Sequence, residues 1–273
     1  MINIDAMIRK EIENGYGDAN AQSKVCQDLI LKAIATSNLN RNVTIKGGVV
    51  MRSKTKNVRR ATQDIDLDFI RYSLSDEAID IFVKRLNCLE GLTITRVGRI
   101  KELKQQDYHG KRIYIRLTDS SGFSIENKLD LGVHNRLDID QEEYCFDIAY
   151  DDEGASLLIN SNEQMIAEKL RSLLRLGTLS TRYKDVFDMY YLCQHADKEK
   201  LSKCLSVYIF DDPSMRERDI NGIYRRISMV FKDRMYLTNL RSRDANWLDE
   251  EIDVVLEGIL EFLNTCTDHP RRS

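Results

Sequence analysis

Three aspartates recur at every second position of the segment DIDLDF: Asp64, Asp66 and Asp68. If this segment is a strand, residues two apart point to the same side, so the carboxylates share one face and the apolar residues between them pack on the other. Like charges on one strand face repel each other. Because Cα atoms two positions apart lie only about 6.5 Å from each other, Asp64 and Asp66 can converge on one divalent cation that compensates their charge. They are predicted ligands for Mg²⁺ or Mn²⁺; the alternative is the solvent-facing side of an edge strand.

Two glycines precede this segment, at the point where an apolar run ends. Gly47 and Gly48 follow VTIK and come before VVM, which predicts a turn from a strand into a helix whose bare backbone amides can approach a phosphate. A phosphate-binding turn and a carboxylate pair are the two halves of a nucleoside triphosphate (NTP) site, because Mg²⁺ bridges the phosphates to the carboxylates. The combination is far more specific than either part alone.

A third acidic ligand is expected on a second strand, since phosphoryl transfer with two metals usually needs one. Asp130 lies between two leucines in FSIENKLDLGV and is the predicted third carboxylate. Glu126 on the same strand face is a rival for this role. The alternative is that Asp130 only pairs with Lys128 on a solvated face.

Two charged residues in the second half of the chain lie at unusual places on predicted helices. Lys169 falls inside the apolar arc of EQMIAEKLRSLLRL, so its ammonium either reaches out to solvent or meets a buried anion such as a triphosphate. Asp185 lies at the margin of the apolar face of YKDVFDMYYLCQH. The alternative makes Lys184 and Asp188 an exposed pair one turn apart and Asp185 a residue at the packing edge.

These residues require a mixed sheet followed by a helical region. Apolar patterns predict strands at VTIK, DIDLDFIRY, LTITRVGRI, RIYIRLTD and FSIENKLDLGVH, and helices over residues 25–37 and 76–87. From Ser161 the pattern is helical, with Ser161 and Gln164 as a capping box and Gly177 as the end of the first helix. We expect an α+β fold, with a sheet domain over residues 1–155 and a helical domain over 156–273 that completes the nucleotide site.

Composition excludes several classes of protein. A net charge of −3 argues against a protein that coats DNA, although local basic patches can still bind nucleic acid. The six cysteines show neither a C-x-x-C pair nor zinc spacing, which is typical of reduced cysteines in a cytoplasmic protein. The sequence shows no apolar signal core and no stretch long enough to span a membrane. A cytoplasmic enzyme is therefore expected.

Four motifs in this order resemble the AbiEii/AbiGii toxin family of nucleotidyltransferases, within the wider DNA polymerase β-like superfamily. They are KGG, the R-x-T-x-D-I-D-L motif that begins at Arg60, AEKLRSLLR and RYKDVFDMYYL, and together they span residues 46–192. The family contains toxins of type IV toxin–antitoxin and phage abortive-infection systems. The resemblance implies a nucleotidyltransferase fold, a cognate antitoxin as partner, and transfer of nucleotides to the 3′ end of a tRNA, which blocks aminoacylation and hence translation.

The resemblance also assigns roles to individual residues. It places the metal-binding pair on Asp64 and Asp66, the lysine of the third motif on Lys169, the aspartate of the fourth on Asp185, and the phosphate-binding turn on Gly47 and Gly48. Arg60 and Thr62 belong to the second motif and are placed in the nucleotide site. Many family members carry a hydroxyl residue after the glycines, whereas this chain has Val49, so only backbone amides remain for the phosphate.

The expected reaction transfers a nucleoside monophosphate (NMP) and releases pyrophosphate. Lys169 is expected to neutralise the leaving pyrophosphate and Asp185 to position Lys169 or the nucleotide. Asp130 is expected to bind a second metal or to accept the proton of the attacking hydroxyl. An RNA acceptor is consistent with the basic loop MRSKTKNVRRATQ and with six later arginines, Arg216, Arg218, Arg225, Arg226, Arg241 and Arg243. Solvated helix faces are the alternative for these basic residues.

Three other functions remain open at this level. A nucleotidyltransferase that modifies a small molecule such as an antibiotic would need an acidic pocket for a cationic substrate, which the acidic run over residues 147–153 could provide. A nucleotidyltransferase or phosphotransferase that modifies a protein would share the same nucleotide-binding parts. The chain could also be a catalytically silent module that binds a partner, but such a module has no physical need to keep clustered like charges.

Overall fold

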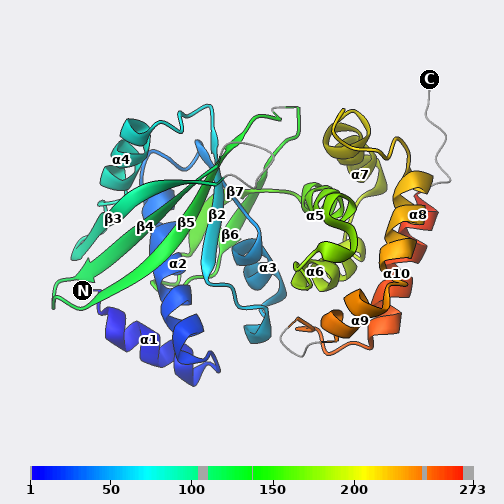
Figure 1. Cartoon of the computed structure of the whole chain (residues 1–273). Helices are drawn as coiled ribbons and strands as arrows, with labels where there is room; N and C mark the ends of the chain where they lie inside the picture. The colour runs from blue at the N-terminus through cyan, green and yellow to red at the C-terminus, as the bar shows by residue number, and fades with distance from the viewer. Residues whose placement is uncertain (1, 104–109, 137, 242–244, 267–273) are drawn as a thin grey trace. The chain divides into compact units, whose positions relative to one another are not determined.

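The chain separates into two compact units, Met1–Asn160 and Ser161–Ser273. The computed structural model describes residues 2–103, 110–136, 138–241 and 245–266 (Figure 1). We call the first unit the sheet unit and the second the helical unit, and each is described by itself. The boundary expected after residue 155 falls at the first residue of the last strand of the sheet unit.

The sheet unit is built on a seven-stranded mixed sheet with the strand order β3-β4-β5-β2-β1-β7-β6. The strands are β1 (Val43–Lys46), β2 (Asp64–Ile70), β3 (Leu92–Leu103), β4 (Gly110–Asp119), β5 (Ser124–His134), β6 (Glu142–Phe146) and β7 (Ala155–Ile159). Strand β2 pairs in parallel with β5 and antiparallel with β1, which in turn pairs in parallel with β7. The expected α+β fold with a mixed sheet is therefore confirmed. Strands β6 and β7 were not predicted, and β6 begins with two glutamates, which are depleted in strands.

Helices α2 and α4 pack on the apolar face of the sheet. The helices of this unit are α1 (Ile4–Glu13), α2 (Asp18–Thr36), α3 (Gly48–Thr55) and α4 (Asp76–Arg85), with a 3-10 turn, η1 (Val58–Arg60). Phe69 of β2 meets Phe82 of α4 edge to face, with 5.0 Å between the ring centroids. Asn127 of β5 donates to the carbonyl oxygen of Ser23 in α2 over 3.4 Å. The alternate residues of β2, which carry the carboxylates, therefore point to the other face.

A tight turn at one end of the β4–β5 hairpin fixes how these two strands pair. Asp119 accepts hydrogen bonds from the backbone amides of Ser121 and Phe123 at 2.9 and 3.1 Å, and from the amide of Ile4 at 3.0 Å. These bonds, with one from the Ser121 hydroxyl, lower the pKa of Asp119 below its ordinary value. The turn sets Thr118 opposite Ser124, and every later pair along the hairpin follows from it.

The helical unit consists of six helices and two short turns within the residues that the structure describes. They are α5 (Asn162–Leu176), α6 (Lys184–Cys193), α7 (Lys198–Leu205), α8 (Ile220–Val230), α9 (Arg234–Leu240), α10 (Ile252–Thr265), η2 (Gly177–Leu179) and η3 (Ser206–Phe210). Ser161 caps α5 by accepting from the Gln164 amide over 3.1 Å, and α5 ends at Gly177, as predicted. The Gln164 side chain also binds Glu168 and Tyr208.

Two helices, α8 and α9, share one amphipathic segment of the sequence. The segment IYRRISMVFKDRMYL forms α8, which ends at Val230, and α9, which Asp233 caps by accepting from the Tyr236 amide over 2.8 Å. Over the described residues, no helix combines the length and apolar character needed to cross a membrane.

Candidate functional site

The acidic residues of β2 lie in a row of charges that crosses the sheet. Asp66 is directly opposite Lys46 of β1 on one side and Asp130 of β5 on the other. Asp130 in turn is opposite Arg112 of β4. Residues that are opposite each other in neighbouring strands point to the same face, so the row runs basic, acidic, acidic, basic. The structure therefore brings the predicted residues Asp66 and Asp130 together.

Two of the three β2 carboxylates are neutralised by lysines. The Nζ atom of Lys128 lies 2.9 Å from Oδ1 of Asp64, and the Nζ atom of Lys46 lies 2.7 Å from Oδ1 of Asp68. The carboxylate of Asp66 has neither a hydrogen bond nor an ion pair with any residue that the structure describes. Asp66 is therefore the carboxylate of this strand that is left open to a ligand.

Asp130 is held by an arginine fork. Arg112 Nε lies 2.6 Å from Oδ1 of Asp130 and Arg112 Nη2 lies 2.7 Å from Oδ2, a bidentate ion pair. The alternative in which Asp130 pairs with Lys128 on a solvated face is wrong, because Asp130 is only 8 % exposed and Lys128 binds Asp64. The rival Glu126 lies beyond the end of β2, whose first residue is opposite Lys128.

Burial and the neighbouring charges change the pKa of Asp66. Burial raises its pKa from 3.8 to about 6. Lys46 acts in the opposite direction, whereas the charges of Asp130, Asp64 and Asp68 raise the pKa further. A positive ligand beside Asp66 would relieve this repulsion.

The donor set fits a divalent cation at two of the three predicted positions. The carboxylates of Asp64 and Asp66 supply the hard oxygen ligands that Mg²⁺ prefers, and Asp66 has no competing partner among the described residues. Both oxygens of Asp130, by contrast, are engaged by Arg112. Within the described part of the chain, no group of three His, Cys, Asp or Glu residues is arranged to hold a metal ion. The structure therefore fits Asp64 and Asp66 as ligands and does not fit Asp130 as a third.

The two glycines form the turn from β1 into α3, and this turn touches the acidic strand. Gly47 has a φ of +68°, and a Cβ atom there would stand 2.5 Å from Oδ2 of Asp66. A Cβ atom at Gly48 would stand 2.6 Å from Oγ1 of Thr62. No side chain caps the start of α3, so its first amides have no partner within the helix. The geometry places bare helix N–H groups beside Asp66.

The neighbours of the glycine turn have different surroundings. Val49 is fully buried and contributes no side chain to the surface of the turn. Arg60, in η1, is also buried, and Thr62 packs against Gly48 through its side chain. Sequence reasoning placed both Arg60 and Thr62 in the nucleotide site; the structure places Thr62 at the glycine turn.

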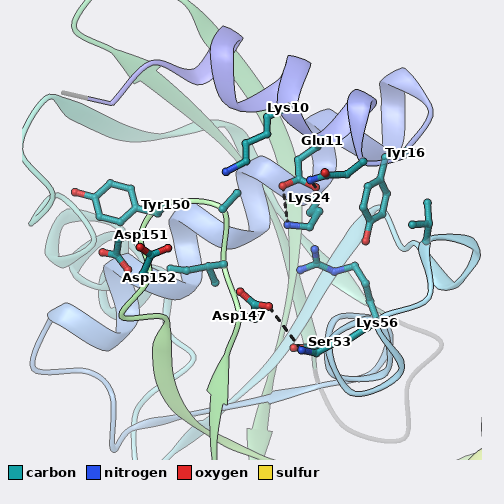
Figure 2. Close-up of a pocket in the computed structure, with 15 residues that line it drawn as sticks. Lys10, Glu11, Tyr16, Lys24, Ser53, Lys56, Asp147, Tyr150, Asp151 and Asp152 are labelled. Atoms are coloured by element: carbon teal, nitrogen blue, oxygen red, sulfur yellow. Dashed lines mark hydrogen bonds and ion pairs between the residues drawn. The ribbon is translucent and has the colours of Figure 1, made fainter.

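A separate pocket of about 680 Å³ lies in the sheet unit between α1, α2, α3 and the β6–β7 connection. Figure 2 shows acidic side chains of the 147–152 segment facing basic ones. The basic residues in its wall are Lys10, Lys24, Arg52 and Lys56. Asp151 is paired with Lys32 over 2.8 Å. Because its walls are of mixed charge, this pocket does not favour the cationic small-molecule substrate considered from the acidic run.

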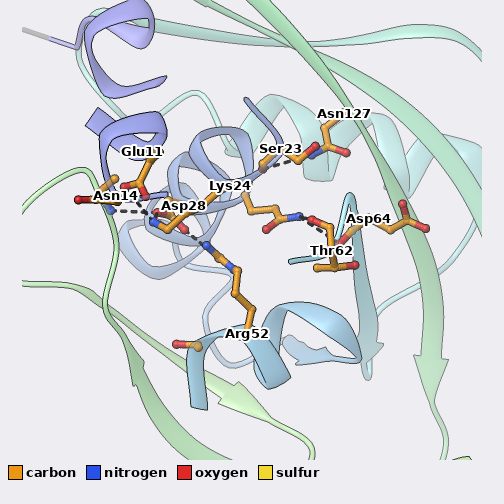
Figure 3. A network of polar contacts seen from close by, with 12 residues as sticks. Glu11, Asn14, Ser23, Lys24, Asp28, Arg52, Thr62, Asp64 and Asn127 are labelled. Carbon is orange, nitrogen blue, oxygen red and sulfur yellow. Dashed lines mark hydrogen bonds and ion pairs between the residues drawn. The ribbon is translucent and has the colours of Figure 1, made fainter. Parts of the chain in front are cut away.

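A buried polar network beneath this pocket ties α2 to the start of β2 (Figure 3). Gln27 donates to the carbonyl oxygens of Thr62 and Asp64 at 2.8 and 3.4 Å. The next residue, Asp28, is fully buried and accepts from Arg52 of α3 over 3.0 Å and from Lys24 over 2.6 Å. The network therefore anchors strand β2 and the helix that follows the glycines to the same helix, α2.

In the helical unit, Lys169 is paired with two carboxylates on α6. Its Nζ atom lies 2.5 Å from Oδ1 of Asp185 and 2.8 Å from Oδ2 of Asp188. Asp188 is fully buried, and its Oδ1 also accepts from Nε1 of Trp247 over 3.1 Å. The alternative of an exposed pair between Lys184 and Asp188 is therefore wrong. Sequence reasoning assigned no functional role to Asp188 or Trp247, which meet only through the fold.

Arginines of the helical unit line a groove of about 450 Å³ on and before α8. They are Arg216, Arg218, Arg225 and Arg226. Arg218 donates to the carbonyl oxygens of Phe210 and Asp212. The guanidinium groups of the other three form no ion pair with residues that the structure describes. Arg243, which was grouped with them, lies outside the described residues.

Known proteins provide an independent comparison. Residues 29–262 match the model of the family described as "Nucleotidyl transferase AbiEii toxin, Type IV TA system". Among solved structures, the chain is similar to the antibiotic-resistance factor ANT(2″)-Ia, with 17% sequence identity and a TM-score of 0.42. That similarity covers 70% of this chain and 92% of the other. No similar sequence was found among curated proteins.

The family match covers well over half of the chain and includes every residue of the acidic row and of the Lys169 cluster. The family is one of enzymes, and its systems pair each toxin with an antitoxin. The chain therefore belongs to the AbiEii family of nucleotidyltransferase toxins of type IV toxin–antitoxin systems.

Proposed function

We propose that this toxin transfers an NMP from an NTP to an RNA acceptor, the 3′ end of a tRNA, in a reaction that depends on Mg²⁺. The single observation that carries the proposal is the contact between the Gly47 turn and Asp66. It joins a free helix N-terminus, which suits phosphate, to a carboxylate pair, which suits the cation bound to that phosphate. The modified tRNA would no longer be aminoacylated, and translation would stop, as expected of a toxin in phage defence.

The reaction needs charge to be neutralised at two places. The amides at the start of α3 would donate to the triphosphate, and Asp64 and Asp66 would hold Mg²⁺, which supplies positive charge for the phosphates when it is bound. The acceptor hydroxyl would attack the α-phosphorus, the bond to the β-phosphate would break, and pyrophosphate would leave. Asp130, which is opposite Asp66 across the sheet, would accept the proton of that hydroxyl.

The Lys169 cluster is assigned a supporting role. The charge of Lys169 is already shared by Asp185 and Asp188, so the ammonium is held in a fixed place before any substrate arrives. We propose that Lys169 binds the pyrophosphate as it leaves and that Asp185 positions Lys169. Asp188, which is buried and also accepts a hydrogen bond from Trp247, would keep Lys169 in place through its ion pair.

An RNA acceptor is supported by the arginine groove of the helical unit. Arg216, Arg225 and Arg226 have no acidic partner among the described residues, in a chain whose net charge is −3. Unpaired arginines bind phosphates through charge and through their planar donors. The tRNA 3′ end as the site of modification comes from the family resemblance.

The test is to incubate the purified chain with each labelled NTP, Mg²⁺ and total tRNA, and to separate the products on a denaturing gel. Label in tRNA with the wild type and none with Asp66→Asn is the expected result, and it would also identify the nucleotide. The control is Asp152→Asn, which changes an exposed aspartate of the β6–β7 connection. Label in another RNA, in protein or in a small molecule would retain the nucleotidyltransferase and exclude the tRNA acceptor.

A further inference from the structure

Arg112 occupies the place at which the acidic row would otherwise meet a second cation. The row across the sheet places it next to Asp130, which is next to Asp66. Its planar guanidinium binds both oxygens of Asp130, at 2.6 and 2.7 Å. A guanidinium in this geometry matches a carboxylate with two parallel hydrogen bonds and stays charged at all physiological pH values.

The arginine fork differs from the other basic partners in the row. Lys46 and Lys128 are flexible side chains that each neutralise a carboxylate with a compact ammonium group. The fork satisfies both oxygens of Asp130 at once, in a place where that carboxylate is only 10 % exposed. A cation can therefore replace a lysine contact at Asp64 more readily than it can replace the arginine at Asp130.

We propose that Arg112 takes the place of a second divalent cation in this enzyme. It neutralises Asp130 permanently, leaves Asp64 and Asp66 as the ligands of one cation, and lowers the affinity of the site for divalent cations in the absence of NTP. The inference rests on the proposed function only in taking that cation to be Mg²⁺. Arg112 is thus a positioning residue that fixes the carboxylate of Asp130 and sets the number of metals.

The experiment measures cation binding without any substrate. The full chain is stripped of metal and titrated with Mn²⁺ alone, and the free Mn²⁺ is followed by electron paramagnetic resonance. The wild type is expected to bind one Mn²⁺. Arg112→Gln is expected to bind Mn²⁺ about tenfold more tightly, or more, because the freed Asp130 becomes a ligand; a tenfold change corresponds to about 1.4 kcal/mol. The double variant Arg112→Gln/Asp130→Asn is expected to lose this gain.

Arg116 provides a matched control on the same strand. Its Nε and Nη2 atoms lie 2.8 and 2.6 Å from a single oxygen of Glu126, Oε1, and this pair lies beyond the end of β2. Arg116→Gln should therefore leave Mn²⁺ binding unchanged. If Arg112→Gln does not fold, Arg112→Lys is used, which keeps the charge, loses the fork and is expected to give a smaller gain.

Two results would overturn the inference. One is a wild-type chain that binds two Mn²⁺ ions with Arg112 in place. The other is an Arg112 variant that folds and binds Mn²⁺ no more tightly than the wild type. Both results come from Mn²⁺ binding without NTP or RNA. A failure to label RNA in the transfer assay would therefore reject the proposed function, while the inference about Arg112 would still be decided by the Mn²⁺ titration.

Discussion

Gly47 lies directly against the carboxylate of Asp66. A Cβ atom at Gly47 would stand 2.5 Å from Oδ2 of Asp66, closer than any real Cβ contact. The backbone of Gly47 also has a positive φ, +68°, which favours glycine. The glycine turn and strand β2 therefore fit against each other because position 47 carries no side chain.

Gly47→Ala should abolish transfer by displacing Asp66 rather than by unfolding the chain. Gly98→Ala is the matched control, because Gly98 has a φ of +69° and a methyl group added there would meet no atom within 4 Å. Both glycines have a positive φ, so each substitution introduces backbone strain. We expect NMP transfer to fall at least tenfold for Gly47→Ala alone, measured as initial rate, while both variants remain folded, as their melting curves would show. Equal activity in the two variants would contradict the assignment.

Asp66→Asn should stabilise the metal-free chain at neutral pH and not at acid pH. The pKa of Asp66 is raised in the folded chain from 3.8 to about 6, so folding disfavours its charged form. The penalty is absent below about pH 4, grows as pH rises from 4 to 6, and is fully present above 6. Removing the charge therefore raises the free energy of unfolding above pH 6. Urea unfolding in EDTA at pH 4.5 and 7.5 measures the difference between variant and wild type.

The direction of that change is the critical result. Desolvation, followed by repulsion from neighbouring carboxylates, is the physical reason for it. This account of Asp66 would be rejected if Asp66→Asn lowered the free energy of unfolding relative to the wild type, and lowered it more at pH 7.5 than at pH 4.5. Asp152→Asn, at an exposed position, should show no such dependence on pH.

Asp188 and Asp185 should differ in what their loss does to the helical unit. Asp188 is fully buried between Lys169 and Trp247, whereas the Asp185 side chain is 21 % exposed. Asp188→Ala is expected to lower the free energy of unfolding by about 3–5 kcal/mol, the usual cost of breaking a buried pair. Asp185→Ala should cost clearly less. Trp247 is the only tryptophan in the chain, so its fluorescence during urea unfolding reports on this cluster. Equal losses would show that Asp188 has no special structural role.

The arginine groove should determine how strongly tRNA binding depends on salt. Each arginine that contacts a phosphate contributes to the slope of log K against log salt. Arg225→Gln and Arg226→Gln are each expected to weaken binding to all tRNAs alike and to reduce that slope by about 1. Arg9→Gln is the control, since Arg9 is an exposed arginine already paired with Asp5. Filter binding at several KCl concentrations gives the slopes, and an unchanged slope in both groove variants would exclude this surface from RNA binding.

The sequence was sufficient wherever a local rule decides the geometry. Alternation in β2 placed its three aspartates on one face, because the side-chain period of a strand is two. The Ser161 cap and the Gly177 end of α5 were likewise predicted, since a helix start and stop depend on a few neighbouring residues. For Asp66 and Asp130, the sequence predicted that two strands each carry an acidic ligand, but not that the two residues are directly opposite each other.

What the sequence did not reveal depends on contacts between distant segments. Trp247 reaches Asp188 from 59 residues away along the chain, and no local pattern signals that hydrogen bond. Gln27 and Asp28 are polar residues within an apolar helix, and their partners come from other elements. Arg112 is a partial exception. The sequence DSSG at residues 119–122 is typical of a turn, and combined with the pairing rule of a hairpin it would have placed Arg112 opposite Asp130.

The length of the turn that Asp119 stabilises sets the register between β4 and β5. The Asp119 carboxylate holds the hairpin turn roughly 20 Å along the strands from Arg112. One residue gained or lost in that turn would slip β4 against β5 and turn Arg112 to the opposite face. Lys111 or Ile113 would then stand beside Asp130 in place of Arg112, so the row would lose its arginine fork without any substitution in it. Related toxins that differ in the length of this loop should therefore differ in how tightly they bind divalent cations. An insertion or deletion in the turn would in this way change the site at the far end of the hairpin.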